Sequence, residues 1–501
     1  MMKKLLTILM LIPFLGIAQQ SYSIAQDTFN INGVNTKVGP AAFMWDLSNA
    51  KFEVPKGSGK HSIFNHEYWI GGIDDGGQLR VAAQTYRQQG NDFWAGPVSD
   101  SVYHNDIDMA GWDRVWKINK TEIDDYITNF INQNPNYTIP DIILNWPAHG
   151  DVSMGQSPYL APFIDSDSNG IYDPYQGDYP DIKGDQAIYI IRNDVGDIHT
   201  HFDGKKMGIE QHIMFYGYRC DNHPELNNTL FVSMKIYNRG IHNLHDVYAG
   251  TFTDIDLGYF ADDYVGCNVP LNLGYGYNGD NEDLGSYGYG YNPPAQGIVY
   301  LNQTMSKFMY FWGSSGGAPV DNPNYDTDIY NYLSGKWLNG QNLTYGGDGM
   351  GNGSGATNDS CSYYFPGTTD PAFPGQDWSE TTAGNNPADR RFSQSHGPFD
   401  LDTNQSFTLD YAFVFAWDST NTNGGSVPLL FNYTQNIQDF YDGVLTMPCS
   451  NINAVNDVSI LSKGRLVRII DVLGREIIPK SNIPLFYIYD DGTVEKRIVI
   501  E

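Results

Sequence analysis

The chain has 501 residues, and its 58 acidic residues outnumber 29 basic ones, giving a net charge of −29. A surface of that sign repels nucleic acid and anionic membranes, which are therefore poor partners, whereas cations suit it well. Aromatic residues at 14% and 53 glycines, with only 17% charged residues, favour strands and turns over long helices.

The N-terminus has the pattern of a secretory signal peptide over residues 1–18. Lys3 and Lys4 are followed by an apolar run at residues 5–17 and by a small-x-small cleavage site at residues 16–18. The run is too short to span a membrane, and no other run of about 18 apolar residues occurs, so we expect no transmembrane segment. Removal of Lys3 and Lys4 changes the net charge from −29 to −31.

The remaining body is longer than the stretch of chain that one hydrophobic core normally serves. We therefore predict two domains, at residues 19–205 and 206–448, with a boundary near residues 199–206. The first should be β-rich with one helix. Asn119 and Glu122 have capping-box spacing, and they precede an i, i+3, i+4, i+7 apolar stripe from Ile123 to Ile131. We expect this helix to pack on a sheet.

Strand-like runs dominate the second half and follow one another with turn signals but without helices between them. This pattern predicts an all-β fold with minor α content, built from β-sandwich domains. The runs lie at residues 188–191, 212–218, 230–237, 247–252, 308–312 and 407–415.

Two low-complexity segments interrupt this half of the chain. Residues 346–355 are glycine-rich and lack the apolar position of calcium-binding nonapeptide repeats. Elsewhere, tyrosines alternate largely with glycine, which indicates either a face that stacks on sugar rings or a surface loop anchored by tyrosines. These tyrosines are Tyr275, Tyr277, Tyr287, Tyr289 and Tyr291.

The clearest chemical motif is an acidic loop with the spacing of the first three-quarters of an EF-hand. Oxygen ligands at positions 1, 3, 5, 7 and 9, with Gly170 at position 6, suit Ca²⁺, and we predict a structural calcium site, the alternative being a solvated turn. Position 12 is Gln176 instead of Glu, so Asp178 or Asp181 is a candidate to complete the shell. The predicted ligands are Asp165, Asp167, Asn169, Ile171 and Asp173.

A second acidic group comprises Asp254, Asp256, Asp262 and Asp263. Asp254 and Asp256 should point to one side of an extended backbone, where repulsion favours a bound cation or raises one pKa. A structural turn or a calcium site is the main interpretation. The alternative is the acid and base of a secreted hydrolase acting on polysaccharide.

Histidine and cysteine patterns leave several possibilities open. His199, His201, Glu210 and His212 could assemble a transition-metal site, but no second-ligand motif supports it, and an exposed loop is favoured. The chain has no Cys-x-x-Cys, so structural zinc is not expected; two disulfides, or one bridge with free thiols, are both compatible with an exported chain. The cysteines are Cys220, Cys267, Cys361 and Cys449.

Residues 453–501 form a separate, charge-neutral segment with three strand-like runs, of which the last two can pair as a hairpin. The motif IIDVLGRE at residues 469–476, followed by LFYIYDDGTVEKR at residues 485–497, resembles the type A C-terminal sorting domain of the Bacteroidetes type IX secretion system. PLFY at residues 484–487 stands where the commonest form has Gly-x-Tyr. The resemblance implies a small β-sandwich module that engages the secretion machinery and takes the body across the outer membrane.

The body is also similar to large uncharacterised exported proteins of the same bacterial group. The similarity is carried by WIGGID at residues 69–74, APFID at 161–165, GDYP at 177–180, DIDLG at 254–258 and DDYVGC at 262–267. It implies no known activity. We therefore expect a protein that passes through the periplasm and is secreted or held at the outer cell surface, stabilised by Ca²⁺, with a binding or structural role and extracellular polysaccharide as its ligand.

Overall fold

The computed structural model describes residues 25–41, 43–44, 52–86, 89–99, 109–312, 319–422 and 424–449 of the body, and residues 466–470, 475, 484–489 and 494–498 near the C-terminus. The predicted signal peptide lies outside the described residues. The chain divides into two compact units, one up to Ser450 and one from Asn451 onward.

Two antiparallel sheets build the first unit, which confirms the all-β prediction. The six-stranded sheet has the order β19-β20-β13-β4-β3, with β5 also paired to β4. Its strands are β3 (Phe52–Glu53), β4 (His61–Asp74), β5 (Leu79–Ala83), β13 (Leu244–Ile255), β19 (Lys307–Phe311) and β20 (Arg390–Leu401).

The nine-stranded sheet has the order β14-β15-β18-β21-β12-β11-β10-β6, with β7 also paired to β10. Its strands are β6 (Trp94–Ala95), β7 (Trp116–Asn119), β10 (Gln186–Asn193), β11 (Ile209–Gly217), β12 (Thr229–Asn238), β14 (Asp263–Asn268), β15 (Leu273–Asn278), β18 (Ala295–Tyr300) and β21 (Ser406–Ala416). Three short ribbons pair β1 (Asp27–Phe29) with β2 (Thr36–Val38), β8 (Phe163–Ile164) with β9 (Tyr179–Pro180), and β16 (Glu282–Asp283) with β17 (Gly290–Tyr291).

Alternation along the strands of the nine-stranded sheet divides the side chains between two cores. On β21, Tyr411 and Phe413 enter the core shared with the six-stranded sheet, whereas Ala412 and Val414 enter a second core on the opposite face. Because this sheet is covered on both faces, the sequences of its strands are nearly continuous apolar runs.

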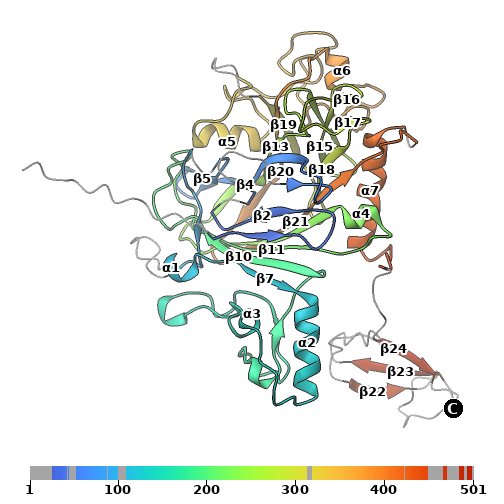
Figure 1. Ribbon diagram of the computed structural model, residues 1–501. Helices are drawn as coiled ribbons and strands as arrows, with labels where there is room; N and C mark the ends of the chain where they lie inside the picture. The colour runs from blue at the N-terminus through green and yellow to red at the C-terminus, as the bar shows by residue number, and fades with distance from the viewer. Residues whose placement is uncertain are drawn as a thin grey trace, which may run out of the picture. The chain divides into compact units, whose positions relative to one another are not determined.

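Helices cover the outer faces of the sheets. The second core receives Ile123 and Tyr126 from α2 (Lys120–Ile131) and Leu430 from α7 (Ser426–Tyr441), while α5 (Asp326–Leu333) packs on the six-stranded sheet. Figure 1 shows α2 and α3 (Asp141–Leu144) on the side of β7 and β10, and α5 on the side of β4 and β5. The shorter helices are α1 (Met109–Trp112), α3 (Asp141–Leu144), α4 (Pro224–Asn227), α6 (Glu380–Ala383) and the 3-10 turns η2 (Val152–Met154) and η3 (Pro174–Gln176).

The predicted helix is confirmed with its cap. Glu122 Oε2 accepts a hydrogen bond of 3.0 Å from the backbone N–H of Asn119, the residue before the first turn of α2. The buried residues of α2 lie on the stripe that faces β7, as the apolar spacing predicts.

The prediction of two domains within the body is wrong. Strand β10 pairs with β11 across the expected boundary, and β4 pairs along its length with β13. Both large sheets therefore take strands from each side of residue 205, and one hydrophobic core serves them. The prediction rested on the length of the body, but strands from both halves pair in the same two sheets, with one core between the sheets and a second on the other face of the nine-stranded sheet.

A buried ion pair joins the two sheets. Glu67 on β4 and Arg192 on β10 are both inaccessible to solvent, with 3.3 Å between Oε2 and Nη1. The guanidinium of Arg192 lies 3.9 Å from the centroid of the Phe43 ring and 4.0 Å from that of Phe93. This cation–π sandwich offsets part of the cost of burying the charge.

One disulfide links Cys220 to Cys449, 229 residues apart, while Cys267 and Cys361 are free thiols. The sequence left this choice open. The bridge ties the chain after α7 to the segment between β11 and α4, beside the second core.

The second unit contains one three-stranded antiparallel sheet in the order β22-β23-β24. The strands are β22 (Leu466–Ile470), β23 (Pro484–Tyr489) and β24 (Val494–Ile498), and the pairing of β23 with β24 confirms the predicted hairpin. The turn signal Asp491-Gly492 lies outside the described residues.

Candidate functional site

The predicted calcium loop is closed by the ribbon of β8 and β9, in which Ile164 is opposite Tyr179. This pairing brings Asp165, directly after β8, close to Asp178, directly before β9. Asp165, Asp167 and Asp178 each place one carboxylate oxygen within 4.8 Å of the other two, so the three side chains can hold a metal ion. The structure thus confirms that acidic side chains gather here.

Backbone N–H groups fix the carboxylates of this loop. Asp165 Oδ2 accepts a hydrogen bond of 2.7 Å from Gly170, and this bond is the largest influence holding the pKa of Asp165 below its usual value. Gly170 has φ +79°, a left-handed conformation that glycine adopts without a Cβ penalty. Asp178 is buried, and it accepts from the N–H of Ser166 at 2.7 Å and of Asp173 at 2.9 Å.

The other predicted ligands shape the loop. Asn169 Oδ1 accepts from the N–H of Ile171 at 2.7 Å, and Asp173 Oδ1 accepts from the N–H of Tyr175 at 2.9 Å, which caps η3. Asp178, rather than Asp173, contributes the third carboxylate of the group. Its place next to Asp165 follows from the β8–β9 pairing, which is too short for periodicity to reveal.

A second acidic group lies where β13 pairs with β20. Asp254 and Asp256 share it with Asp389, and their carboxylates also lie within 4.8 Å of one another. Burial raises the pKa of both Asp254 and Asp256, and the Asp254 charge raises that of Asp256 further. The two side chains therefore lie on one side of the backbone, as their spacing predicts.

Positive charge partly neutralises this second group. Arg391 Nε lies 3.4 Å from Asp254 Oδ1, and Arg391 Nη2 lies 3.0 Å from Asp389 Oδ2. Tyr86 donates its hydroxyl proton to Asp254 Oδ2. Sequence reasoning missed Asp389 because only the register of β13 against β20, with Asp254 opposite Arg391, brings it here.

Asp262 and Asp263 have a different role from Asp254. Asp263 Oδ2 accepts from the N–H of Leu257 at 3.1 Å, and Asp262 Oδ2 from the N–H of Leu284 at 3.2 Å. They fasten the turn after β13 to the β16–β17 ribbon. Asp283 completes this fastening, because its two oxygens accept from the backbone N–H groups of Tyr259 and Tyr289.

The burial of Asp254 argues against the hydrolase alternative. Its exposed fraction is 2%, and neither Asp254 nor Asp256 lines the pocket described below. A glycosidase needs both carboxyl groups open to the sugar and to water. A structural role, or a small cation, fits this geometry better.

The histidine residues do not form the exposed loop that the sequence favoured. His199 is buried, and its ring nitrogens face the carbonyl oxygens of Val81 at 3.0 Å and Asp194 at 2.7 Å. Both ring nitrogens therefore point at protein oxygens and not toward a metal position shared with other side chains. His212 Nε2 pairs with Glu210 at 2.8 Å.

The alternating tyrosines separate into two sets. Tyr275 and Tyr277 lie on the same side of β15, with ring centroids 5.6 Å apart, and Tyr275 packs on Phe431 of α7. Tyr289 is buried, whereas Tyr287 and Tyr291 have exposed fractions of 71% and 70%. Tyr275, Tyr277 and Tyr289 therefore anchor the fold, whereas Tyr287 and Tyr291 are open to solvent.

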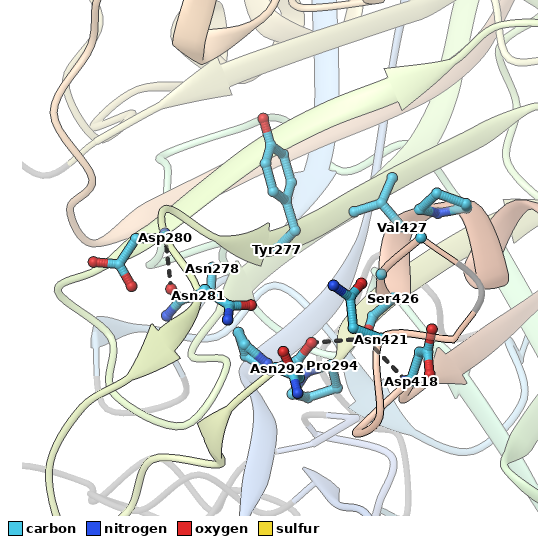
Figure 2. A pocket seen from close by; sticks show the side chains of 14 residues that line it. Tyr277, Asn278, Asp280, Asn281, Asn292, Pro294, Asp418, Asn421, Ser426 and Val427 are labelled. Carbon is cyan, nitrogen blue, oxygen red and sulfur yellow. Dashed lines mark hydrogen bonds between the residues drawn. The ribbon is translucent and has the colours of Figure 1, made fainter.

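A pocket of about 170 Å³ opens beside Tyr277, where the ends of β15 and β21 meet the starts of β18 and α7. Figure 2 shows Tyr277 and Val427 above it, Asn292 and Asp418 below it, and the side chain of Asn421 between them. The described polar side chains in its lining are Asn278, Asp280, Asn281, Asn292, Asp418, Asn421 and Ser426.

In comparisons with known proteins, no protein-family model and no curated protein matches the chain. Among the helices of the described residues, none has the length and apolar character needed to cross a membrane.

Proposed function

We propose that this chain is an exported β-rich protein of the cell surface, with a binding or structural role, whose body is stabilised by Ca²⁺ bound in the loop from Asp165 to Asp178. The observation that carries the proposal is the convergence of Asp165, Asp167 and Asp178 in a loop whose sequence has calcium-loop spacing.

The chemistry of this loop favours Ca²⁺ over a transition metal. All three side chains offer carboxylate oxygens, which suit hard cations, and the group contains no histidine or cysteine. Asn169 and the carbonyl of Ile171 lie within the same loop and remain predicted ligands. Calcium would join the two ends of a 14-residue segment, 165–178, that contains no strand of its own.

Three features support export. The disulfide between Cys220 and Cys449 persists in oxidising compartments outside the cytoplasm. The C-terminal unit is separate from the body and contains the strands expected of a sorting module. Its motifs resemble the type A sorting domain, so we propose the type IX secretion machinery as its partner and the outer surface or the medium as the destination.

Deletion of residues 451–501 tests the export step. In a bacterium with a type IX system, the truncated chain should accumulate in the periplasm, whereas the full chain should reach the cell surface or the medium. As a control, the same residues fused to a periplasmic reporter should carry the reporter outward. Unchanged export of the truncated chain would refute the assignment.

A further inference from the structure

An exposed aromatic surface lies next to the Tyr277 pocket. Two lining residues, Asn281 and Asn292, flank the β16–β17 ribbon, and the N–H of Asn292 donates a hydrogen bond of 3.1 Å to the carbonyl oxygen of Asn281. Tyr287 and Tyr291 lie on this ribbon with most of their surface exposed. The ribbon thus connects the pocket directly to the exposed rings.

A neighbouring turn extends this surface. Tyr259 and Phe260, in the turn after β13, are exposed and pack on one another with ring centroids 5.3 Å apart. Buried Asp283 holds the turn to the ribbon through the N–H of Tyr259 at 3.0 Å. Gly258 is required here, since it has φ +78° and a Cβ would lie 2.0 Å from the Asp283 carboxylate. The aromatic surface is therefore built on a fixed turn.

Hydrogen-bonding groups in the pocket complement the rings. The side-chain amides of Asn281 and Asn421 are exposed and make no hydrogen bond to any described residue. Each amide has one acceptor oxygen and two N–H donors, which is the set that binds vicinal hydroxyl groups. The first turn of α7, whose residues Ser426 and Val427 are in the lining, has no capping side chain at Gly425.

Size and charge restrict the ligand. A volume of about 170 Å³ is below the roughly 300–1,000 Å³ of pockets for drug-sized ligands, so it admits one ring-sized unit. Asp280 and Asp418 are in the lining, and none of its described residues is lysine or arginine. An anionic ligand is therefore disfavoured, whereas a neutral hydroxylated ring is compatible with the site.

We infer that the Tyr277 pocket and the adjoining aromatic residues Tyr259, Phe260, Tyr287 and Tyr291 form a binding site for a neutral polysaccharide. One sugar unit occupies the pocket and bonds to Asn281 and Asn421, and neighbouring units stack their C–H faces on the exposed rings. The inference deepens the proposed function by giving the surface protein its ligand class.

Binding of neutral hexasaccharides by calorimetry tests the site. The probes are cellohexaose, laminarihexaose, xylohexaose and mannohexaose, with hexagalacturonate as the anionic comparison. The full chain should bind at least one neutral probe and bind hexagalacturonate at least tenfold more weakly. Tyr291→Ala and Asn281→Ala should each weaken the binding about tenfold or more. Tyr325→Ala serves as a matched control, because Tyr325 is 61% exposed and belongs to the cap of α5.

Folded protein that binds none of the neutral probes would overturn the inference, as would variants at Tyr291 and Asn281 that bind as tightly as the unchanged chain. Preference for hexagalacturonate would also overturn it. Circular dichroism of each variant confirms that it is folded. Export is measured separately on the chain lacking residues 451–501, so failure of glycan binding is distinguishable from failure of the export assignment.

Discussion

Replacement of Asp178 by Asn is the sharpest test of the calcium loop, because the two side chains have the same shape and differ in charge. The Asp178 carboxylate is buried and accepts two backbone hydrogen bonds, from Ser166 at 2.7 Å and Asp173 at 2.9 Å. An amide keeps one acceptor and presents N–H to the other donor. The unsatisfied N–H costs about 1–3 kcal/mol without calcium, offset in part by relief of repulsion from Asp165 and Asp167.

The gain in the free energy of unfolding on Ca²⁺ binding, called the increment below, is the larger signal. Extracellular calcium modules have Kd on the order of 10⁻⁴ to 10⁻³ M, and a ligand at 100 times Kd stabilises the folded state by about 2.7 kcal/mol. The full chain in about 10 mM Ca²⁺ should therefore gain up to that amount over the chain in EDTA. With an m-value of about 3 kcal/mol/M, the urea midpoint rises by about 0.9 M.

The assay compares urea midpoints in Ca²⁺ and in EDTA for the unchanged chain, Asp178→Asn and Asp151→Asn. Asp151 is a matched control, because it accepts a backbone N–H at 2.9 Å from Ser153 in an exposed turn and is not part of the acidic group. The increment should vanish in Asp178→Asn and remain in Asp151→Asn. An unchanged chain with the same midpoint in EDTA, or an Asp178→Asn chain that keeps the increment, would refute the calcium assignment.

Three further predictions concern the body. Glu380→Gln should lower the free energy of unfolding, measured by urea titration, by about 3–5 kcal/mol. The reason is that Glu380 and Arg390 are fully buried, with Arg390 Nε and Nη2 at 2.9 and 3.0 Å from the two carboxylate oxygens. A loss below about 1 kcal/mol would contradict this. Cys220→Ser should lower the free energy of unfolding by about 5 kcal/mol, because the bridge closes a loop of 229 residues in the unfolded chain. Reduction of the unchanged chain with dithiothreitol should lower it by the same amount. Identical urea midpoints of the oxidised and reduced chains would show that the bridge does not form. Burial raises the pKa of Asp283 from 3.8 to about 6, so the folded state binds its proton more tightly and stability falls as pH rises through this window. Asp283→Asn should flatten the dependence of the urea midpoint between pH 4 and pH 7, and an unchanged slope would remove Asp283 as its source.

Local elements could be predicted from the sequence, whereas long-range pairing could not. The apolar run at residues 407–415 predicts a strand, and β21 extends over it. Nothing in that run indicates that β21 lies between β18 and β12. Helix α7 escaped prediction because it carries aromatic and β-branched residues, and Pro428 lies in its first turn.

The acidic sites show the same limit. Asp165 and Asp167 are two residues apart and predict a shared ligand position, and Asp178 was a candidate because it follows within the same loop. Asp389 is far along the chain from Asp254 and becomes its neighbour only through the pairing of β13 with β20. Local spacing therefore finds part of a site, and sheet register supplies the rest.

The way each carboxylate is compensated separates the acidic groups by function. Glu67, Glu380 and Asp254 face arginines, and Asp263 and Asp283 face backbone N–H groups. The carboxylates of Asp165, Asp167 and Asp178 lie together, yet no lysine or arginine forms an ion pair with them among the described residues. Asp178 is buried, whereas Asp165 is half-buried and Asp167 is exposed, so backbone N–H groups and water solvate these charges, and a bound Ca²⁺ would relieve the repulsion among the three carboxylates. This loop, rather than the Asp254 group with its Arg391, is therefore where the stability of the body should depend on calcium.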